Sequence, residues 1–454
     1  MAPGEQTARD SREEVPSSWT RRGACPTLLE PMQTGDGLLA RLRPAGGILS
    51  VQQFIQLAEA AQRHGNGILE ITARGSLQIR GLGPETVQPL AADLDAAGIS
   101  VPAGPVIELS PLHGIAPDEI GNPAEIEVLL RDELAAELLS PMLAPKLSIL
   151  IDGGGNCGLA AVTGDIRVTA ISAGVWQIAI NGDGRTALPL LTGSADQAVR
   201  AVGDLLCLLI SLGRHKRCRD LERARLLSAF PAMARMKLAS APAFQDPLVG
   251  TLTLADGPAV LGLRPRFGQM HAGDLIAFLG SAKAFGATQV RPSPGHIFLL
   301  AELSSRSAML IAQMASRYGL SADRHDPSAH IATCAGAGAC ASGYYQTKAN
   351  AERLVSIAPE LLDGSMVVHL SGCAKGCAHP QPALSIVGAQ DGYHLILNGK
   401  ASDAPDAQIA SGDIDSAIEE LARLIKNERH AGESAAACLR RVGKGDVTRP
   451  LRQG

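Results

Sequence analysis

The feature of this 454-residue chain that most constrains its fold is an internal repeat. The tripeptide Leu42-Arg43-Pro44 returns as Leu263-Arg264-Pro265, so the two copies are offset by 221 residues. In each copy the tripeptide ends a strand-like segment, and a helix-like segment, a glycine and two more strand-like segments follow. An internal repeat indicates that the chain contains two copies of one structural unit, and this changes the interpretation of every segment within it. We therefore predict two copies of a β-α-β-β unit.

The first copy carries clear signals for the ends of its helix. Ser50 and Gln53 form a capping-box pair, and Gly65 is placed to end the helix. The apolar periodicity changes from the helical to the strand pattern on either side. The expected elements are a strand at 38–42, a helix with its apolar face at 54–61, strands at 68–72 and 77–80, and a helix at about 86–97.

A second pair of echoes accompanies the first. Lys146–Asp152 precedes a turn containing glycine and cysteine, as Met366–Leu370 does, and each is followed by a hairpin-like segment that ends in Asn-Gly. Chance recurrence is the alternative, but the common order favours an α+β protein made by tandem duplication of a two-part unit. The expected segments are a disordered tail at 1–22, a first half-domain at 23–97, an α/β domain at 98–240, a second half-domain at 241–325, a second α/β domain at 326–429 and a flexible tail at 430–454.

Composition excludes several classes of protein. The 41 basic and 45 acidic residues nearly cancel and aromatic residues make up 3% of the chain, which argues against a nucleic-acid partner. The longest apolar run, Leu205–Leu212, is far shorter than the ~20 residues that span a bilayer, and no apolar secretory segment is found. We therefore expect a cytoplasmic protein without a membrane partner, whose nine cysteines act as ligands, catalysts or buried thiols.

Four of these cysteines lie in two small-residue turns. Cys334 and Cys340 are spaced C-x5-C, and Cys373 and Cys377 are spaced C-x3-C. Four thiolates are the ligand set of a 4Fe–4S cluster, and surrounding Gly and Ala residues let backbone N–H groups approach its sulfides. Structural zinc prefers tighter spacings, and inert buried thiols are the third alternative. The spacing favours an iron–sulfur cluster.

The cysteine motif resembles that of the sulfite and nitrite reductase family, in which it binds a 4Fe–4S cluster and the last cysteine, here Cys377, bridges to sirohaem. Thr72–Gly81 is similar to the family's T-x-R-x-x-x-Q segment, which implies that Arg74 and Gln78 reach a macrocycle. Pro145-Lys146 is similar to an anion-binding lysine stretch. The resemblance implies that the β-α-β-β copies are ferredoxin-like half-domains beside a sulfite-reductase-like cluster and tetrapyrrole domain.

The chain also departs from the reductases. Ser148 stands where the family has a second lysine, and no arginine lies between Val106 and Pro123. A small anion that is reduced by many electrons needs several convergent cations, so these losses indicate another substrate. Arg22–Pro26, Pro31–Gly37 and Ser371–Pro380 resemble a different branch, the precorrin-3B synthases.

That branch implies a monooxygenase of aerobic cobalamin biosynthesis. Its members use dioxygen and NADH-derived electrons to hydroxylate precorrin-3A and form a lactone. The substrate carboxylates would need cations, for which Arg43, Arg74, Arg80 and Lys146 are available. A sirohaem-dependent reductase and a non-enzymatic iron–sulfur carrier or sensor are the alternatives.

The branch also implies a mononuclear non-haem iron, for which His379 is a candidate ligand because neutral imidazole suits iron. Capping of the turn before Pro380 is the other interpretation of His379. Gly153–Gly158 fits G-x-G-x-x-G, but a strand-like segment follows it where a dinucleotide fold needs a helix. We therefore expect a separate NADH-dependent reductase as the electron donor.

Overall fold

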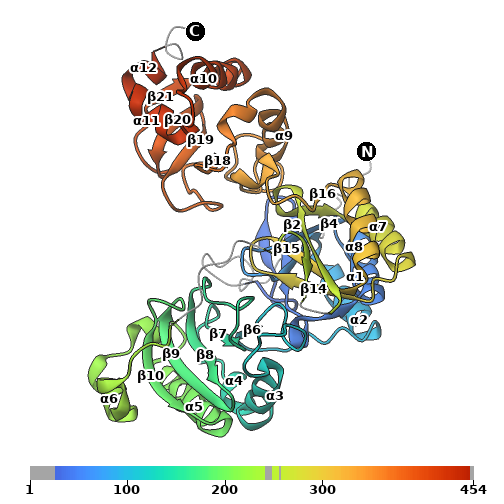
Figure 1. The fold of residues 1–454 in the computed structure, drawn as a ribbon, viewed down its shortest axis with the longest axis vertical. Coiled ribbons are helices and arrows are strands. Elements are labelled where there is room, and N and C mark those ends of the chain that lie inside the picture. The colour runs from blue at the N-terminus through green and yellow to red at the C-terminus, as the bar shows by residue number, and fades with distance from the viewer. Residues whose placement is uncertain (1–25, 241–247, 255–256, 450–454) are drawn as a thin grey trace, which may run out of the picture.

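The computed structural model describes residues 26–240, 248–254 and 257–449. The predicted tail at 1–22 and Cys25 lie outside the described residues. Figure 1 shows three lobes. The central lobe combines an early segment, drawn in blue, with a later segment, drawn in yellow; a green lobe lies below it and an orange-red lobe lies above it. We call them the central domain, the first α/β domain and the second α/β domain.

The central domain contains the two predicted β-α-β-β copies, which confirms the duplication. The first copy comprises β1 (Met32–Thr34), β2 (Gly37–Leu42), β3 (Leu49–Ser50), α1 (Val51–His64), β4 (Ile68–Ile71), β5 (Leu77–Leu82) and α2 (Val87–Ala96). The second comprises β11 (Gly250–Thr253), β12 (Ala259–Pro265), β13 (Gln269–His271), α7 (Ala272–Ala284), β14 (Gln289–Ser293), β15 (Ile297–Leu303), α8 (Ser305–Ala315) and β16 (Leu320–Ser321).

The two copies exchange short strands. Their sheets have the orders β1-β2-β5-β4-β13 and β11-β12-β15-β14-β3, so each sheet ends in a strand from the other copy. Ser50 and Gln53 form the predicted capping box, and Gly65 ends α1. Helices α1 and α7 pack together over one shared apolar core. The two half-domains are therefore one folding unit.

Phe298 marks the centre of this shared core. Its ring is fully buried and meets Phe54 of α1 and Phe278 of α7 edge to face, at centroid distances of 5.9 and 6.4 Å. We expect Phe298→Ala to lower the free energy of unfolding by about 3–5 kcal/mol, because the cavity is enclosed by both copies. Urea denaturation followed by circular dichroism measures this. The matched variant Phe285→Ala, at a residue that is 40% exposed, should change it by less than about 0.5 kcal/mol; equal effects would contradict a shared core.

The two α/β domains also repeat each other. The first comprises β6 (Val106–Leu109), α3 (Pro123–Glu133), α4 (Ala135–Leu138), β7 (Ser148–Asp152), β8 (Gly164–Ser172), β9 (Val175–Gly182), β10 (Leu188–Gly193), α5 (Ala195–Leu212) and α6 (Arg223–Ala229). The second comprises β17 (Ile331–Thr333), α9 (Thr347–Ile357), β18 (Val368–Ser371), β19 (Ala383–Ala389), β20 (Gly392–Gly399), β21 (Ala407–Ile409), α10 (Ile414–Glu428), α11 (Ala435–Val442) and α12 (Lys444–Thr448).

Strand directions confirm this second echo. In each sheet the first three strands along the chain run parallel, and two antiparallel strands complete the sheet. No helix separates β7 from β8, so the G-x-G-x-x-G match at 153–158 does not open a dinucleotide-binding unit. The β7–β8 and β18–β19 loops are equivalent positions, and the second of them carries Cys373 and Cys377.

The prediction of a flexible tail at 430–454 is wrong over most of its length. Residues 435–448 form α11 and α12, and Ala435, Cys438 and Val447 are buried. Ala435 and Val447 belong to the core of the second α/β domain. Both helices are short and polar on their outer faces, so their few apolar residues gave little signal. Among the described residues, no helix has the length and apolar character needed to cross a membrane.

Candidate functional site

The four clustered cysteines lie on two loops that leave the same edge of the second α/β sheet. Cys334 follows β17 and Cys373 follows β18, and these neighbouring strands run parallel. The carboxyl ends of parallel strands lie at one sheet edge, so both loops begin side by side. The Gly372 N–H donates to Cys334 Sγ over 3.1 Å, which joins the loops directly. The structure therefore brings the two predicted pairs together.

Glycines make this close approach possible. Gly336 and Gly338 adopt positive φ angles of 72° and 87°, which a side chain disfavours. Within the first loop, a Cβ atom on Gly343 would lie 2.6 Å from the Ala337 nitrogen. Between the loops, a Cβ atom on Gly372 would lie 3.2 Å from the Gly343 Cα atom. The two loops consequently fold with backbone against backbone around the thiols.

The cysteine side chains influence one another. Burial, followed by the charges of Cys373, Cys334 and Cys340, raises the pKa of the Cys377 thiol. Among the described residues, however, no three His, Cys, Asp or Glu side chains are gathered closely enough to hold a single metal ion. A zinc ion draws its sulfurs together through Zn–S bonds of ~2.3 Å, whereas a cubane cluster binds each thiolate to a different iron. Four thiols on two adjoining loops match the ligand set of a cubane cluster.

Arg80 connects the first ferredoxin-like sheet to these loops. This buried side chain donates to Asp36 over 2.9 and 3.0 Å, and its Nη2 donates to the Ala339 carbonyl in the Cys334–Cys340 loop over 2.9 Å. Glu70 lies 3.5 Å away and also pairs with Lys348 of α9 at 3.3 Å. Through these hydrogen bonds Arg80 links the first ferredoxin-like sheet to the Cys334–Cys340 loop of the second α/β domain. Its predicted contact with substrate stays a prediction.

One face of the first sheet is polar. Leu77 and Ile79 of β5 enter the core, while Gln78 and Arg80 point to the opposite face. In the amide orientation that gives both its oxygen and its nitrogen a hydrogen bond, Gln78 accepts from Arg41 Nη2 at 2.8 Å and donates to Glu70 at 3.2 Å. A polar row thus runs along the sheet towards the cysteine loops.

A cavity of about 670 Å³ opens at the other end of this row. Arg43 and Ser76 line it from the central domain, and Ile107, Arg131 and Pro145 line it from the first α/β domain. Its volume falls within the usual range for small-molecule sites. A second cavity, of about 620 Å³, opens beside Cys373 and Lys375. Possible ligand space therefore lies at both ends of the polar face.

Arg43, which lines the larger cavity, contacts Arg74. Arg43 Nη2 donates to the Arg74 carbonyl, and Arg74 Nε donates to the buried Glu108 Oε1 at 2.7 Å. Arg74 Nη2 lies 2.6 Å from the same oxygen as an ion pair, without a hydrogen bond of its own in the described part of the chain. Burial lowers the pKa of Arg43, and the charge of Glu108 opposes that shift. Arg43 Nε is buried without a hydrogen-bond partner among the described residues, so a ligand oxygen would satisfy it.

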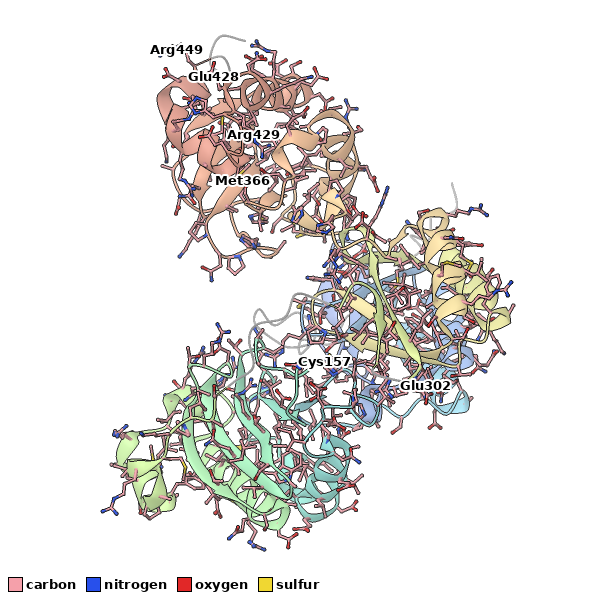
Figure 2. The ribbon with its side chains drawn as sticks, in the orientation of Figure 1. Cys157, Glu302, Met366, Glu428, Arg429 and Arg449 are labelled. Atoms are coloured by element: carbon pink, nitrogen blue, oxygen red, sulfur yellow. The ribbon has the colours of Figure 1, made fainter. Side chains whose placement is uncertain are left out.

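The equivalent face of the second copy is closed. At the offset of 221 residues, Leu299 replaces Gln78 and Ala301 replaces Arg80. Leu299 belongs to an apolar cluster with Val260, Leu112 and Val249, against which Cys157 packs. Figure 2 places Cys157 at the end of the first α/β domain nearest the central domain. Only the first copy thus offers a polar ligand face within the described residues.

The remaining predicted residues lie outside these contacts. Lys146 is exposed beside Pro145 of the cavity wall. His379 lies against His369, with ring centroids 5.9 Å apart. Asp36, Glu108 and Lys348 were missed; each acts through a partner distant in sequence, and no local pattern reveals such pairs.

Comparison with known proteins defines the class. Residues 30–97 match the nitrite/sulfite reductase ferredoxin-like half domain. The structure of Mycobacterium tuberculosis NirA superposes on this chain with a TM-score of 0.66 and 17% sequence identity. The match covers 90% of this chain and 84% of the NirA chain, which shows a common fold. A ferredoxin–nitrite reductase from Synechococcus elongatus is 26% identical over 80% of each chain. The fold is that of the nitrite and sulfite reductases, as the sequence predicted.

A nearer relative defines the family. A precorrin-3B synthase from Sinorhizobium sp. is 44% identical over 438 residues, covering 96% of this chain and 95% of its own. The chain belongs to the precorrin-3B synthase family.

Proposed function

We propose that the protein is an oxidoreductase that hydroxylates precorrin-3A with dioxygen and forms the lactone of precorrin-3B in cobalamin biosynthesis. The observation that carries this proposal is the 44% identity to a precorrin-3B synthase over 96% of the chain. The polar face and cavity of the first copy support it, because a tetrapyrrole rimmed with carboxylates needs a broad site with separated cations.

Cys334, Cys340, Cys373 and Cys377 are the proposed ligands of a 4Fe–4S cluster. Bound there, the cluster supplies single electrons. The chain's own contribution is to close the two loops through the bond from Gly372 to Cys334 and to hold them against the first sheet through Arg80. The proposal thus places electron entry and substrate on one continuous polar face.

Substrate contacts are proposed for residues at and near the cavity end of that face. Arg43, with its unpartnered Nε at the cavity, is the first candidate for a carboxylate. Arg74 lies beside it and is 37% exposed in its side chain, so it can reach a second group. Gln78 orients Arg41 and Glu70, and Lys146 is placed to meet a carboxylate at the outer rim.

Dioxygen and a separate NADH-dependent reductase complete the proposed reaction. The family resemblance also implied a mononuclear non-haem iron with His379 as a ligand. The described residues do not fit such a site, because His379 has only His369 beside it and no third ligating side chain joins them.

A sirohaem-dependent reductase is the competing function, favoured by the common fold. An absorption spectrum with parallel assays separates the two. We expect a broad iron–sulfur shoulder without strong sirohaem bands, and consumption of precorrin-3A that requires dioxygen and a reductant. Strong sirohaem bands together with reduction of sulfite or nitrite would contradict the proposal.

A further inference from the structure

The charge around Arg74 is not what a small oxyanion requires. Arg74 Nε donates a hydrogen bond to Glu108 Oε1 at 2.7 Å, and Arg74 Nη2 forms an ion-pair contact with the same oxygen at 2.6 Å. The Glu108 side chain is only 2% exposed, so solvent screens its charge weakly. The carboxylate therefore neutralises much of the positive charge that Arg74 presents to the site.

Other cations at the two ends of the polar face have acidic partners as well. Arg131 pairs with Glu127 at 2.7 Å, and Lys348 pairs with Glu70 at 3.3 Å. Sulfite or nitrite would need several unneutralised cations converging on a few oxygen atoms. Carboxylates spread around a macrocycle need only one cation each, and such a cation can keep an acidic protein partner. The arrangement on this face matches the second requirement.

We propose that Glu108 is a specificity-determining residue, which neutralises Arg74 so that the site rejects small oxyanions and admits a large polycarboxylate. This inference rests on the tetrapyrrole substrate of the proposed function. Glu108 acts through Arg74 and is a positioning residue. Its Oε2 has no hydrogen-bond partner among the described residues, so Glu108→Gln removes the charge without breaking a second contact.

Sulfite titration by isothermal calorimetry, on the full chain at low ionic strength, tests the proposal without turnover. We expect Glu108→Gln to bind sulfite at least about tenfold more tightly than the unsubstituted protein, because Arg74 gains an unneutralised charge. The double variant R74Q/E108Q should lose that gain. Glu433→Gln is the matched control, because Glu433 pairs at 2.8 Å with Arg441, whose side chain is 36% exposed, and neither residue lines either cavity; this variant should bind sulfite as the unsubstituted protein does.

Unchanged sulfite affinity in Glu108→Gln, or an equal gain in Glu433→Gln, would overturn the role of Glu108. If Glu108→Gln does not fold, Glu108→Asp withdraws the carboxylate from Arg74 and should tighten sulfite binding in the same direction; no change there would also overturn the proposal. The proposed function is tested by a separate measurement. Sulfite reduction by the unsubstituted protein would contradict that function, whatever sulfite affinities the variants show.

Discussion

Replacing Cys340 with serine should remove the iron–sulfur cluster and the activity together. A serine hydroxyl is not deprotonated like a thiol at neutral pH, so one iron of the cubane would lose its protein ligand. We expect acid-labile sulfide and iron to fall to near background. Turnover of precorrin-3A should fall by more than about 100-fold, beyond the usual effect of losing a partner that only supports a metal ligand.

Cys207→Ser is the matched control for this substitution. Cys207 is an exposed free thiol on α5 of the first α/β domain, away from both cysteine loops. It should keep its iron, its sulfide and its activity. An active Cys340→Ser protein that lacks the cluster would refute the assigned role, and so would a full cluster in that variant.

Replacing Arg43 with glutamine should weaken substrate binding. Hydrogen bonds to charged groups contribute about 1.5–3 kcal/mol, so KM for precorrin-3A should rise about 10- to 100-fold while kcat changes little. Steady-state kinetics at saturating reductant measures both constants. Thermal unfolding of the same sample shows whether the variant is folded.

The repeat supplies the control for Arg43. Arg264 occupies the same place in the second Leu-Arg-Pro tripeptide, beside the closed apolar face. Arg264→Gln should leave KM unchanged, because no substrate is proposed there. Equal increases in KM for both variants would mean that the two copies are equivalent, against the assignment of the site to the first copy.

The parts of the fold that were predictable depend on local patterns. The cap formed by Ser50 and Gln53 and the alternation in β5 are decided by neighbours within a few residues, and the structure has both. The exchange of β3 and β13 was not predictable, because strands of two and three residues carry no periodicity. Helices α11 and α12 were missed because each buries few side chains.

In the candidate site, too, the residues set by local patterns were predictable and those set by long-range contacts were not. The four cysteines were predictable because their spacing and the glycines around them lie within two short loops. The hydrogen bond from Arg80 to the Ala339 carbonyl joins residues 259 positions apart, and the ion pair of Arg74 with Glu108 joins two domains. Such contacts depend on how domains meet, which a single sequence does not encode in any local pattern.

The origin of the inserted oxygen tests the account most directly. Purified protein with a restored cluster is incubated with precorrin-3A, a reductant and isotopically labelled dioxygen, and the product is examined by mass spectrometry. A monooxygenase should give one labelled oxygen atom per product molecule, none when labelled water replaces labelled dioxygen, and no product without dioxygen. Turnover of precorrin-3A without dioxygen, or label that enters only from water, would contradict that activity.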